Sequence, residues 1–373
     1  MPPADAAPAP APTAVVATPP ATPAQTPPAV AAPPAKTWKD LITVDGLVDA
    51  YYMAYLNPQS GANNSLTSPS GRAFDQNSNT FTLNYARLGL GMSADNVSLR
   101  MDLGYGSMGN IINGNGAVSG GGTTMAGAPV TGLGFFAEQA YAEVSPVTNF
   151  TIDLGKFDTT AGAEVIQANK NWLYSRSFLF NAIPLVHTGL RLGYKVNDMV
   201  SVQGSVVNGW NGQGFEVDGN SNKTIGLNAA ITLPMGVGII PTIYFGKETG
   251  STDTRFLGDL VGTYTMGNLG LNLNIDYIND KAGGYDGFIG FAPMAHYVVS
   301  DKLNVTARGE FVHNKIMGTS VSYEELTLGC ALPVAGHFEF RPEARGDFSN
   351  QDAFAGATKK NQFTLTGAFL AYF

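Results

Sequence analysis

The sequence predicts an all-β protein, a transmembrane antiparallel up-and-down β-barrel of about sixteen strands. Three observations carry this prediction. Apolar and polar residues alternate with a period of two along many segments, only 13% of the 373 residues are charged, and short turns alternate with longer polar connections. These features are typical of bacterial outer-membrane barrels, in which lipid-facing and lumen-facing side chains alternate along each strand.

The clearest predicted strand spans residues 97–105, where five apolar residues alternate with Ser98, Arg100, Asp102 and Gly104. The same alternation recurs at residues 150–154, 190–195, 271–277, 305–311 and 338–341. A soluble β-sandwich also alternates, so the period alone does not separate the two classes. Several strands also carry a Tyr where a lipid-water girdle is expected, namely Tyr52, Tyr105, Tyr194, Tyr277 and Tyr372.

The lengths of the connections favour the barrel. Short turns are expected at residues 93–96, 146–149, 197–199, 234–237, 267–268, 300–302 and 333–336. Longer polar loops are expected at residues 57–79, 107–134, 159–183, 211–222, 249–254, 279–287, 314–320 and 349–360. An even number of strands, short turns at one rim and long loops at the other are typical of an outer-membrane barrel. Both termini then lie on the short-turn side.

The chain divides into a linker at residues 1–40 and a barrel at residues 41–373. Of the first 36 residues, 25 are Ala or Pro, and the only charged ones are Asp5 and Lys36. Such a segment buries too few apolar side chains to offset the entropy of ordering, and its Pro content favours extended conformations. We predict a disordered periplasmic linker. It acts either as a tether or as a solvated tail.

Composition excludes several other classes. The formal net charge of −8 disfavours nucleic-acid binding, which depends on clustered Lys and Arg. The lone Cys330 and the four separated His residues provide no metal-ligand spacing, and no Lys-Ser/Thr follows a phosphate-binding Gly loop. No catalytic, cofactor or metal site is therefore expected. Residues 224–246 are uncharged, but Pro234 and Gly236 indicate a turn between two strands and not a membrane helix.

Charged residues share the polar phase of the predicted strands. Because Arg or Lys on a lipid face costs roughly 2 to 4 kcal/mol near the bilayer centre, most of these residues should line a water-filled lumen. Two interpretations remain open, namely a field that selects ions and ladders of mutually paired charges. The predicted pore-lining residues are Arg87, Arg100, Asp102, Arg191, Arg308, Glu310, Glu325, Glu339, Arg341, Glu343 and Arg345.

The connection at residues 159–183 carries more large apolar residues than a solvated loop needs. It contains Trp172, Phe178 and Phe180, with Lys170 and Arg176 as cations. We predict that this connection folds into the barrel, with a helical turn at residues 163–168, and constricts the pore with Lys170 and Arg176 at the constriction. A plug or a subunit interface is the alternative.

Several motifs resemble a known family. The segments 155–162 (GKFDTTAG) with Glu164, 175–178 (SRSF), 184–191 (PLVHTGLR) and 340–348 (FRPEARGDF), with the terminal Phe373, are similar to the outer-membrane porins called putative beta-barrel porin-2, or OmpL-like. The resemblance covers Val44 to Phe373. It adds Lys156 and Glu164 to the expected pore-lining residues and makes Phe373 the expected signal for the barrel-assembly machinery.

The resemblance implies a Gram-negative outer-membrane channel for passive diffusion of ions and small hydrophilic solutes, with no cofactor. Its expected surroundings are outer-membrane lipid and lipopolysaccharide, and analogy with porins of this size suggests a homotrimer. Residues 155–164 are also similar to phosphate-selective porins, but those need a dense cationic ladder, whereas this lumen is mixed and net acidic. The alternatives are a plugged scaffold barrel that is tethered to the wall or sheathes a partner protein, and an outer-membrane hydrolase.

Overall fold

The computed structural model describes residues 41–57, 71–112, 135–211, 220–248, 254–280, 285–316, 318–355 and 357–373. The predicted linker at residues 1–40 lies outside the described residues. No helix among the described residues is long and apolar enough to cross a membrane.

Sixteen strands make up most of the described chain. Their bounds are β1 Ile42–Tyr55, β2 Phe81–Ala94, β3 Val97–Tyr105, β4 Phe135–Val147, β5 Phe150–Asp158, β6 Val186–Lys195, β7 Val200–Val207, β8 Thr224–Leu233, β9 Val237–Lys247, β10 Thr254–Met266, β11 Leu269–Asp280, β12 Tyr285–Ser300, β13 Leu303–Ile316, β14 Thr319–Ala335, β15 Phe338–Ser349 and β16 Asn361–Tyr372. The predicted strand number is confirmed.

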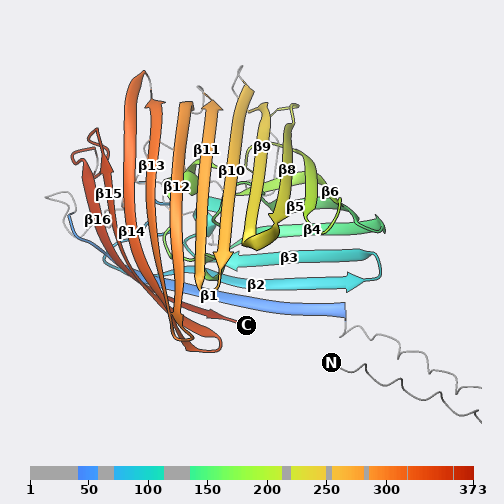
Figure 1. The fold of residues 1–373 in the computed structure, drawn as a ribbon, viewed down its shortest axis with the longest axis horizontal. Coiled ribbons are helices and arrows are strands. Elements are labelled where there is room, and N and C mark those ends of the chain that lie inside the picture. Colours follow the sequence, from blue (N-terminus) through green and yellow to red (C-terminus); the bar gives the residue numbers. More distant parts are fainter. Residues whose placement is uncertain are drawn as a thin grey trace, which may run out of the picture. The chain divides into compact units, whose positions relative to one another are not determined.

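The strands form one closed barrel in which each strand pairs with its neighbours in the sequence (Figure 1). β1 closes the barrel by pairing antiparallel with β16, with Leu47 opposite Tyr372 and Tyr55 opposite Thr364. Closure leaves no unpaired sheet edge. An unpaired edge would leave backbone polar groups without hydrogen-bond partners in the hydrocarbon core of a bilayer. At the seam, a Cβ on Gly46 would lie 2.5 Å from the ring of Phe373, so a larger residue there would displace this terminal ring.

The two faces of the barrel have opposite character, as the period of two predicts. Along β3, Leu99 and Leu103 are more than 40% exposed on the outer face, whereas Asp102 is fully buried on the inner face. Four of the five predicted girdle tyrosines are also exposed, namely Tyr52, Tyr105, Tyr194 and Tyr277. The fifth, Tyr372, was assigned wrongly, because it lies on the lumenal phase of β16 with buried Ala368 and Leu370.

Most predicted connections lie where the sequence placed them. Residues 234–236 form a short 3-10 turn (η2, Pro234–Gly236) between β8 and β9, with Met235 at φ 68°. Several boundaries differ from prediction. β14 continues to Ala335, so its turn falls at Gly336 and His337, and β7 ends at Val207, before the expected loop at residues 211–222. The expected loops at residues 279–287 and 314–320 are shorter, because strand pairing continues into them through polar sequence.

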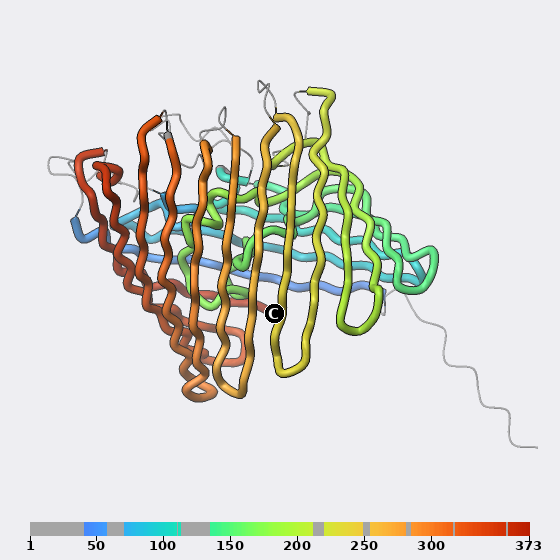
Figure 2. The backbone as a smooth tube through the Cα atoms, turned by 45° about the horizontal axis from the view of Figure 1, so that its top comes forward, coloured from blue at the N-terminus to red at the C-terminus, as the bar shows by residue number. Residues whose placement is uncertain are grey.

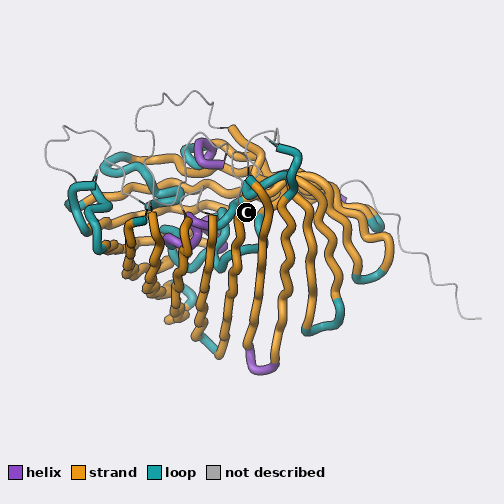
Figure 3. The backbone as a smooth tube through the Cα atoms, turned by 90° about the horizontal axis from the view of Figure 1, so that it is seen from above, coloured by secondary structure: helices purple, strands orange, loops and turns teal. Residues whose placement is uncertain are grey.

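The inside of the barrel contains more than side chains of its wall. The connection between β5 and β6 returns into the ring of strands and carries the 3-10 helix η1 (Ala168–Lys170) and the helix α3 (Phe178–Ala182) (Figures 2 and 3). The short helix α2 (Gly109–Ile112) follows β3. Side chains of these segments and of the inner wall form one apolar cluster, which includes Phe74, Ile112, Ile166, Phe180 and Leu257.

Candidate functional site: the inward loop and the charged lumen

The connection at residues 159–185, here called the inward loop, begins at the end of β5 and is bound along much of its length by the wall. The helical turn predicted at residues 163–168 is wrong. There Glu164 and Val165 are held in irregular backbone, because Asn171 Oδ1 accepts from the Val165 N–H at 2.9 Å and the Glu164 carboxylate accepts from the Ser177 N–H at 2.8 Å. Helical structure begins later, in η1 and α3.

Two wall carboxylates each accept two consecutive backbone N–H groups of the inward loop. Glu310 on β13 accepts from Phe178 at 2.8 Å and from Leu179 at 2.7 Å, at the start of α3. Glu343 on β15 accepts from Tyr174 at 2.8 Å and from Ser175 at 3.1 Å. Hydrogen bonds to a charged acceptor contribute about 1.5 to 3 kcal/mol each, so these two clamps fix the loop backbone.

Three wall arginines bind the carbonyl oxygens of the same loop. Arg308 donates to the Ser175 carbonyl at 2.9 Å, and Arg345 donates to the Arg176 carbonyl at 2.6 Å. Arg341 donates from one nitrogen to two carbonyls, those of Ala168 and Asn171, each at 2.7 Å. The alternation of Arg and Glu on the polar phase of β13 and β15 thus matches the alternating acceptors and donors of a peptide backbone.

Arg308 is the centre of this arrangement and is completely buried. Its guanidinium makes an ion pair with Glu164 of the inward loop at 2.7 Å and a bidentate contact with Glu325 on β14 at 2.9 and 3.3 Å. Arg345 pairs with Asp347 at 2.6 Å. Since a buried charge is costly unless it is paired and hydrogen-bonded, Arg308 links the loop and two strands.

The other end of the loop contacts β1 and β2. The Tyr174 phenol donates to Asp49 Oδ1 at 2.9 Å, and the Asn84 amide donates to Asp49 Oδ2 at 2.9 Å. Burial raises the pKa of the Tyr174 phenol well above its usual value, and the Asp49 charge acts in the same direction, so the phenol remains protonated and donates. The inward loop therefore spans from β13–β15 to β1–β2.

The two cations that the sequence placed at the constriction have different surroundings. Arg176 is only 2% exposed, and its guanidinium donates to the carbonyls of Val165, Tyr174 and Ile166 within the loop. Lys170, at the end of η1, is exposed. Arg176 thus stabilises the loop itself, while Lys170 presents its charge to the lumen.

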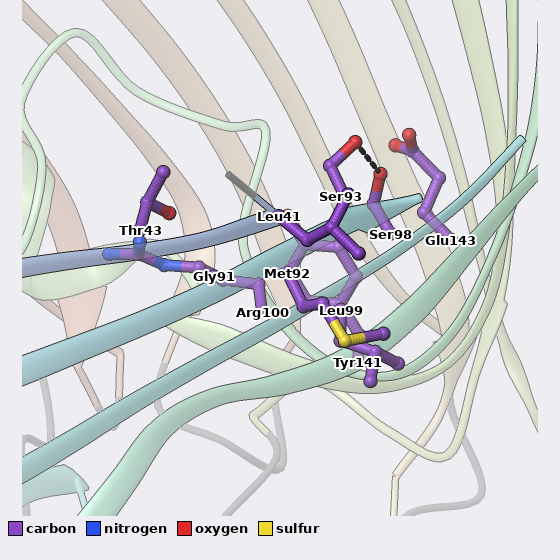
Figure 4. Close-up of a pocket in the computed structure, with 10 residues that line it drawn as sticks. All are labelled: Leu41, Thr43, Gly91, Met92, Ser93, Ser98, Leu99, Arg100, Tyr141 and Glu143. Carbon is purple, nitrogen blue, oxygen red and sulfur yellow. Dashed lines mark hydrogen bonds between the residues drawn. The ribbon is translucent and has the colours of Figure 1, made fainter. Parts of the chain in front are cut away.

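Lys170 lines a cavity of about 430 Å³ together with Arg87, Arg100 and Asp45. Both arginines bond Asp45 and Asp102, and Gln139 also donates to Asp102 at 2.9 Å. A second cavity of about 250 Å³ shares Arg100 and Tyr141 and continues toward the Ser93–Ser98 contact at the short-turn rim (Figure 4). The charged residues on β1–β3 therefore form a ladder of ion pairs that lines these two cavities of the lumen.

The remaining predicted pore-lining residues are also on the inner face. Arg191 pairs with Asp153 at 2.7 Å and lies over the Phe157 ring, with 4.4 Å from its Cζ atom to the ring centroid. Glu339 pairs with Arg341. Lys156, in β5, is 7% exposed. The sequence therefore identified the lumenal phase, but most of these charges bind one another or the inward loop.

Sequence reasoning missed the second segment that enters the barrel. The polar loop predicted at residues 57–79 includes Arg72, which pairs with Asp347 at 3.2 Å and with Asp75 at 3.0 Å, and Phe74, which packs against Phe180. A signal was present. Arg72, Phe74 and Asp75 place two charges and an aromatic ring within four residues, which a loop of Ser, Asn and Gly otherwise lacks.

A closed sixteen-stranded antiparallel barrel with an apolar outer face, a charged inner face and a connection folded into its lumen has the architecture of an outer-membrane porin. Solved structures share this fold. The chain is similar to OprB of Pseudomonas putida (TM-score 0.62, 11% identity, covering 90% of this chain and 95% of that one). It is also similar to the outer-membrane channel DcaP of Acinetobacter baumannii (TM-score 0.59, 12% identity, covering 89% and 97%).

A third similar structure is OmpT of Vibrio cholerae in its trimer form (TM-score 0.56, 12% identity, covering 89% of this chain and 99% of that one). No curated protein matches the chain. The family model described as "Putative beta-barrel porin-2, OmpL-like" matches residues 41–373. The chain belongs to this family and is an outer-membrane channel for passive diffusion of solutes.

Proposed function

We propose that the barrel conducts ions and small hydrophilic solutes past a constriction that does not move, the inward loop. The observation that carries this proposal is the double clamp, in which Glu310 and Glu343 each hold two consecutive N–H groups of the loop. A sixteen-stranded barrel is too wide to be filled by its own wall side chains. Its size limit is therefore set by the loop, and selection among solutes is by size and charge, without catalysis.

Swelling of proteoliposomes in neutral solutes of increasing size tests this proposal. A fixed constriction predicts one sharp size limit, which does not change with the sign of an applied potential. Release of the loop by Glu310→Ala with Glu343→Ala should raise that limit, whereas Glu324→Ala, at an exposed position of β14, should leave it unchanged. The same limit in the double variant as in the wild type would contradict a loop-determined constriction.

A second candidate function is a plugged barrel that serves as a scaffold. The apolar cluster inside the barrel favours it, because Phe74, Phe178 and Phe180 pack where a wide channel would hold water. Proteoliposomes that contain folded protein and yet do not swell, even in the smallest solutes, would favour the scaffold. Loss of envelope attachment on deletion of residues 1–40, with permeability retained, would assign the tether role to the linker.

The surroundings of the barrel follow from this proposal. We infer that residues 1–40 lie in the periplasm, that lipopolysaccharide contacts the outer face, and that the barrel-assembly machinery reads the final strand, in which Phe363, Leu365, Phe369 and Phe373 share the outward phase. Three copies of the chain would form a homotrimer, as in the trimer form of Vibrio cholerae OmpT. Cross-linking in native membranes tests the trimer, and a Phe373→Ser variant tests assembly.

A further inference from the structure

Nearly all guanidinium groups on the inner wall have a carboxylate partner within the described part of the chain. The ion pairs join Arg72, Arg87, Arg100, Arg191, Arg255, Arg308, Arg341 and Arg345 to Asp or Glu residues of the wall or the inward loop. Arg176 and Lys170 make no ion pair with the described residues. Among the described cations of the inner face and the inward loop, these two therefore have no carboxylate in an ion pair, Lys156 having contacts of its own.

More carboxyl groups than cations lack an ion pair among the described residues. They accept hydrogen bonds from amides, a phenol or backbone N–H groups instead of cations, as Glu138 does from Tyr85 and Gln167. These carboxyl groups belong to Asp49, Glu138, Asp158, Asp259, Asp276, Glu310 and Glu343. On the described inner face and inward loop, these seven carboxyl groups outnumber the two cations without an ion pair.

Proton sharing does not remove the excess. Asp259 and Asp276 lie directly opposite each other on β10 and β11, and the Asn274 amide donates to both, at 2.7 and 3.1 Å. Glu138 and Asp158 are also electrostatic neighbours. If each of these two pairs shares one proton, each pair still carries one negative charge.

The two acidic pairs flank a neutral sector of the wall. The described residues of β7, β8 and β9 place only neutral side chains on the lumenal phase, among them the half-buried Gln203 and Asn228. Lys247, at the end of β9, is exposed and on the opposite phase from buried Tyr244. Along the wall, β10–β11 with Asp259 and Asp276 adjoin this sector directly, and β4–β5 with Glu138 and Asp158 lie on its other side beyond β6, which carries Arg191.

We infer that the channel prefers cations, and that the unpaired carboxyl groups Glu138, Asp158, Asp259 and Asp276 are residues that determine this preference. The inference rests on the proposed channel function and specifies cations as the class of solute that the channel prefers. Fixed charges in a narrow pore bias which ions enter. A unit charge about 10 Å from an ion changes the occupancy of that ion about twofold even at the dielectric constant of water, and buried charges are screened less by salt.

The first test is the reversal potential of the purified full-length protein in a planar bilayer under a KCl gradient. We expect a reversal potential whose sign indicates preference for K⁺. The K⁺/Cl⁻ permeability ratio should be larger at 10-fold lower salt, because salt then screens the fixed charges less. Conducting steps with the sign for Cl⁻ preference would overturn the inference and leave the channel function intact. Absence of steps from folded protein would instead overturn the channel function, and the inference with it.

Variants then test the named residues. Asp259→Asn with Asp276→Asn keeps the shape of both side chains and removes their charge, so the K⁺/Cl⁻ permeability ratio should fall by at least about twofold. Glu138→Gln provides the same test on the other flank if the first variant does not fold. The control is Asp198→Asn in the exposed turn after β6, where Asp198 pairs with Lys195. Permeability ratios equal to the control in both flank variants would overturn the assignment.

Discussion

Arg308 shows that the position of a residue in a strand follows from local sequence, whereas its burial depends on residues far away in the chain. It lies on the polar phase of a strand, which the sequence predicts, but burial of its guanidinium depends on Glu164 and Ser175, which are more than 130 residues away in the sequence. Its net contribution is large chiefly because its removal would leave Glu164 without a cation and Glu325 with only the longer contact to Arg345. Whether a charge of the inner face selects ions or only pairs with a neighbouring charge is therefore decided for each residue separately.

Arg308→Met should lower the free energy of unfolding by about 3 to 5 kcal/mol, because the buried Glu164 would lose its cation and Glu325 would keep only the longer contact with Arg345, at 3.8 Å. Urea unfolding in lipid vesicles measures this change. Lys195→Met is the matched control, since its ion pair with Asp198 is exposed and screened by solvent, so its loss should change stability little. Equal losses for the two variants would contradict a central role of Arg308.

The two cations of the inward loop should respond differently to substitution by Ala. Arg176→Ala leaves three loop carbonyls without their donor, so we expect a loss of at least about 2 kcal/mol in the free energy of unfolding and unstable currents. Lys170→Ala should leave stability unchanged and increase the preference for cations, because an exposed positive charge is removed from the lumen. Bilayer recordings and urea unfolding of both variants measure these effects.

At the level of elements, the strands could be predicted from sequence and the inner segments only in part. β3 has the predicted bounds because its alternation is complete from Val97 to Tyr105. The inward loop was recognised from Trp172, Phe178 and Phe180, but the contacts that shape it come from β13 and β15, far away in the sequence. The backbone of residues 163–168 follows the hydrogen bonds of Val165 with Asn171 and of Glu164 with Ser177, and the ion pair of Glu164 with Arg308, and not local helix propensity, which explains the wrong helical turn.

The clamps on the inward loop should determine how steady the current is. Glu310→Ala with Glu343→Ala removes the acceptors of four backbone N–H groups, so the loop should leave its fixed position and single-channel currents should become larger and noisier. Glu324→Ala, at an exposed position of β14, should give wild-type traces. Quiet currents of unchanged size in the double variant would show that the loop is held by other contacts.

At the level of the whole molecule, the barrel and the linker should be separable. The described barrel closes through the pairing of β1 with β16, and every strand of the closed sheet lies within residues 42–372. Deletion of residues 1–40 should therefore leave heat-modifiable folding and single-channel conductance unchanged. A deletion variant that inserts but conducts differently would give the linker a role in the channel itself.

The whole barrel combines an outer surface made for lipid with a lumen that is partly filled by its own chain. The central claim is that enough of the lumen remains open for water and ions to pass beside the inward loop. Single-channel recording of the purified protein in a planar bilayer tests this claim most directly. The account predicts discrete, ohmic steps of uniform size. Silence from correctly folded, heat-modifiable protein would contradict it and show that the inward loop and the apolar cluster close the barrel.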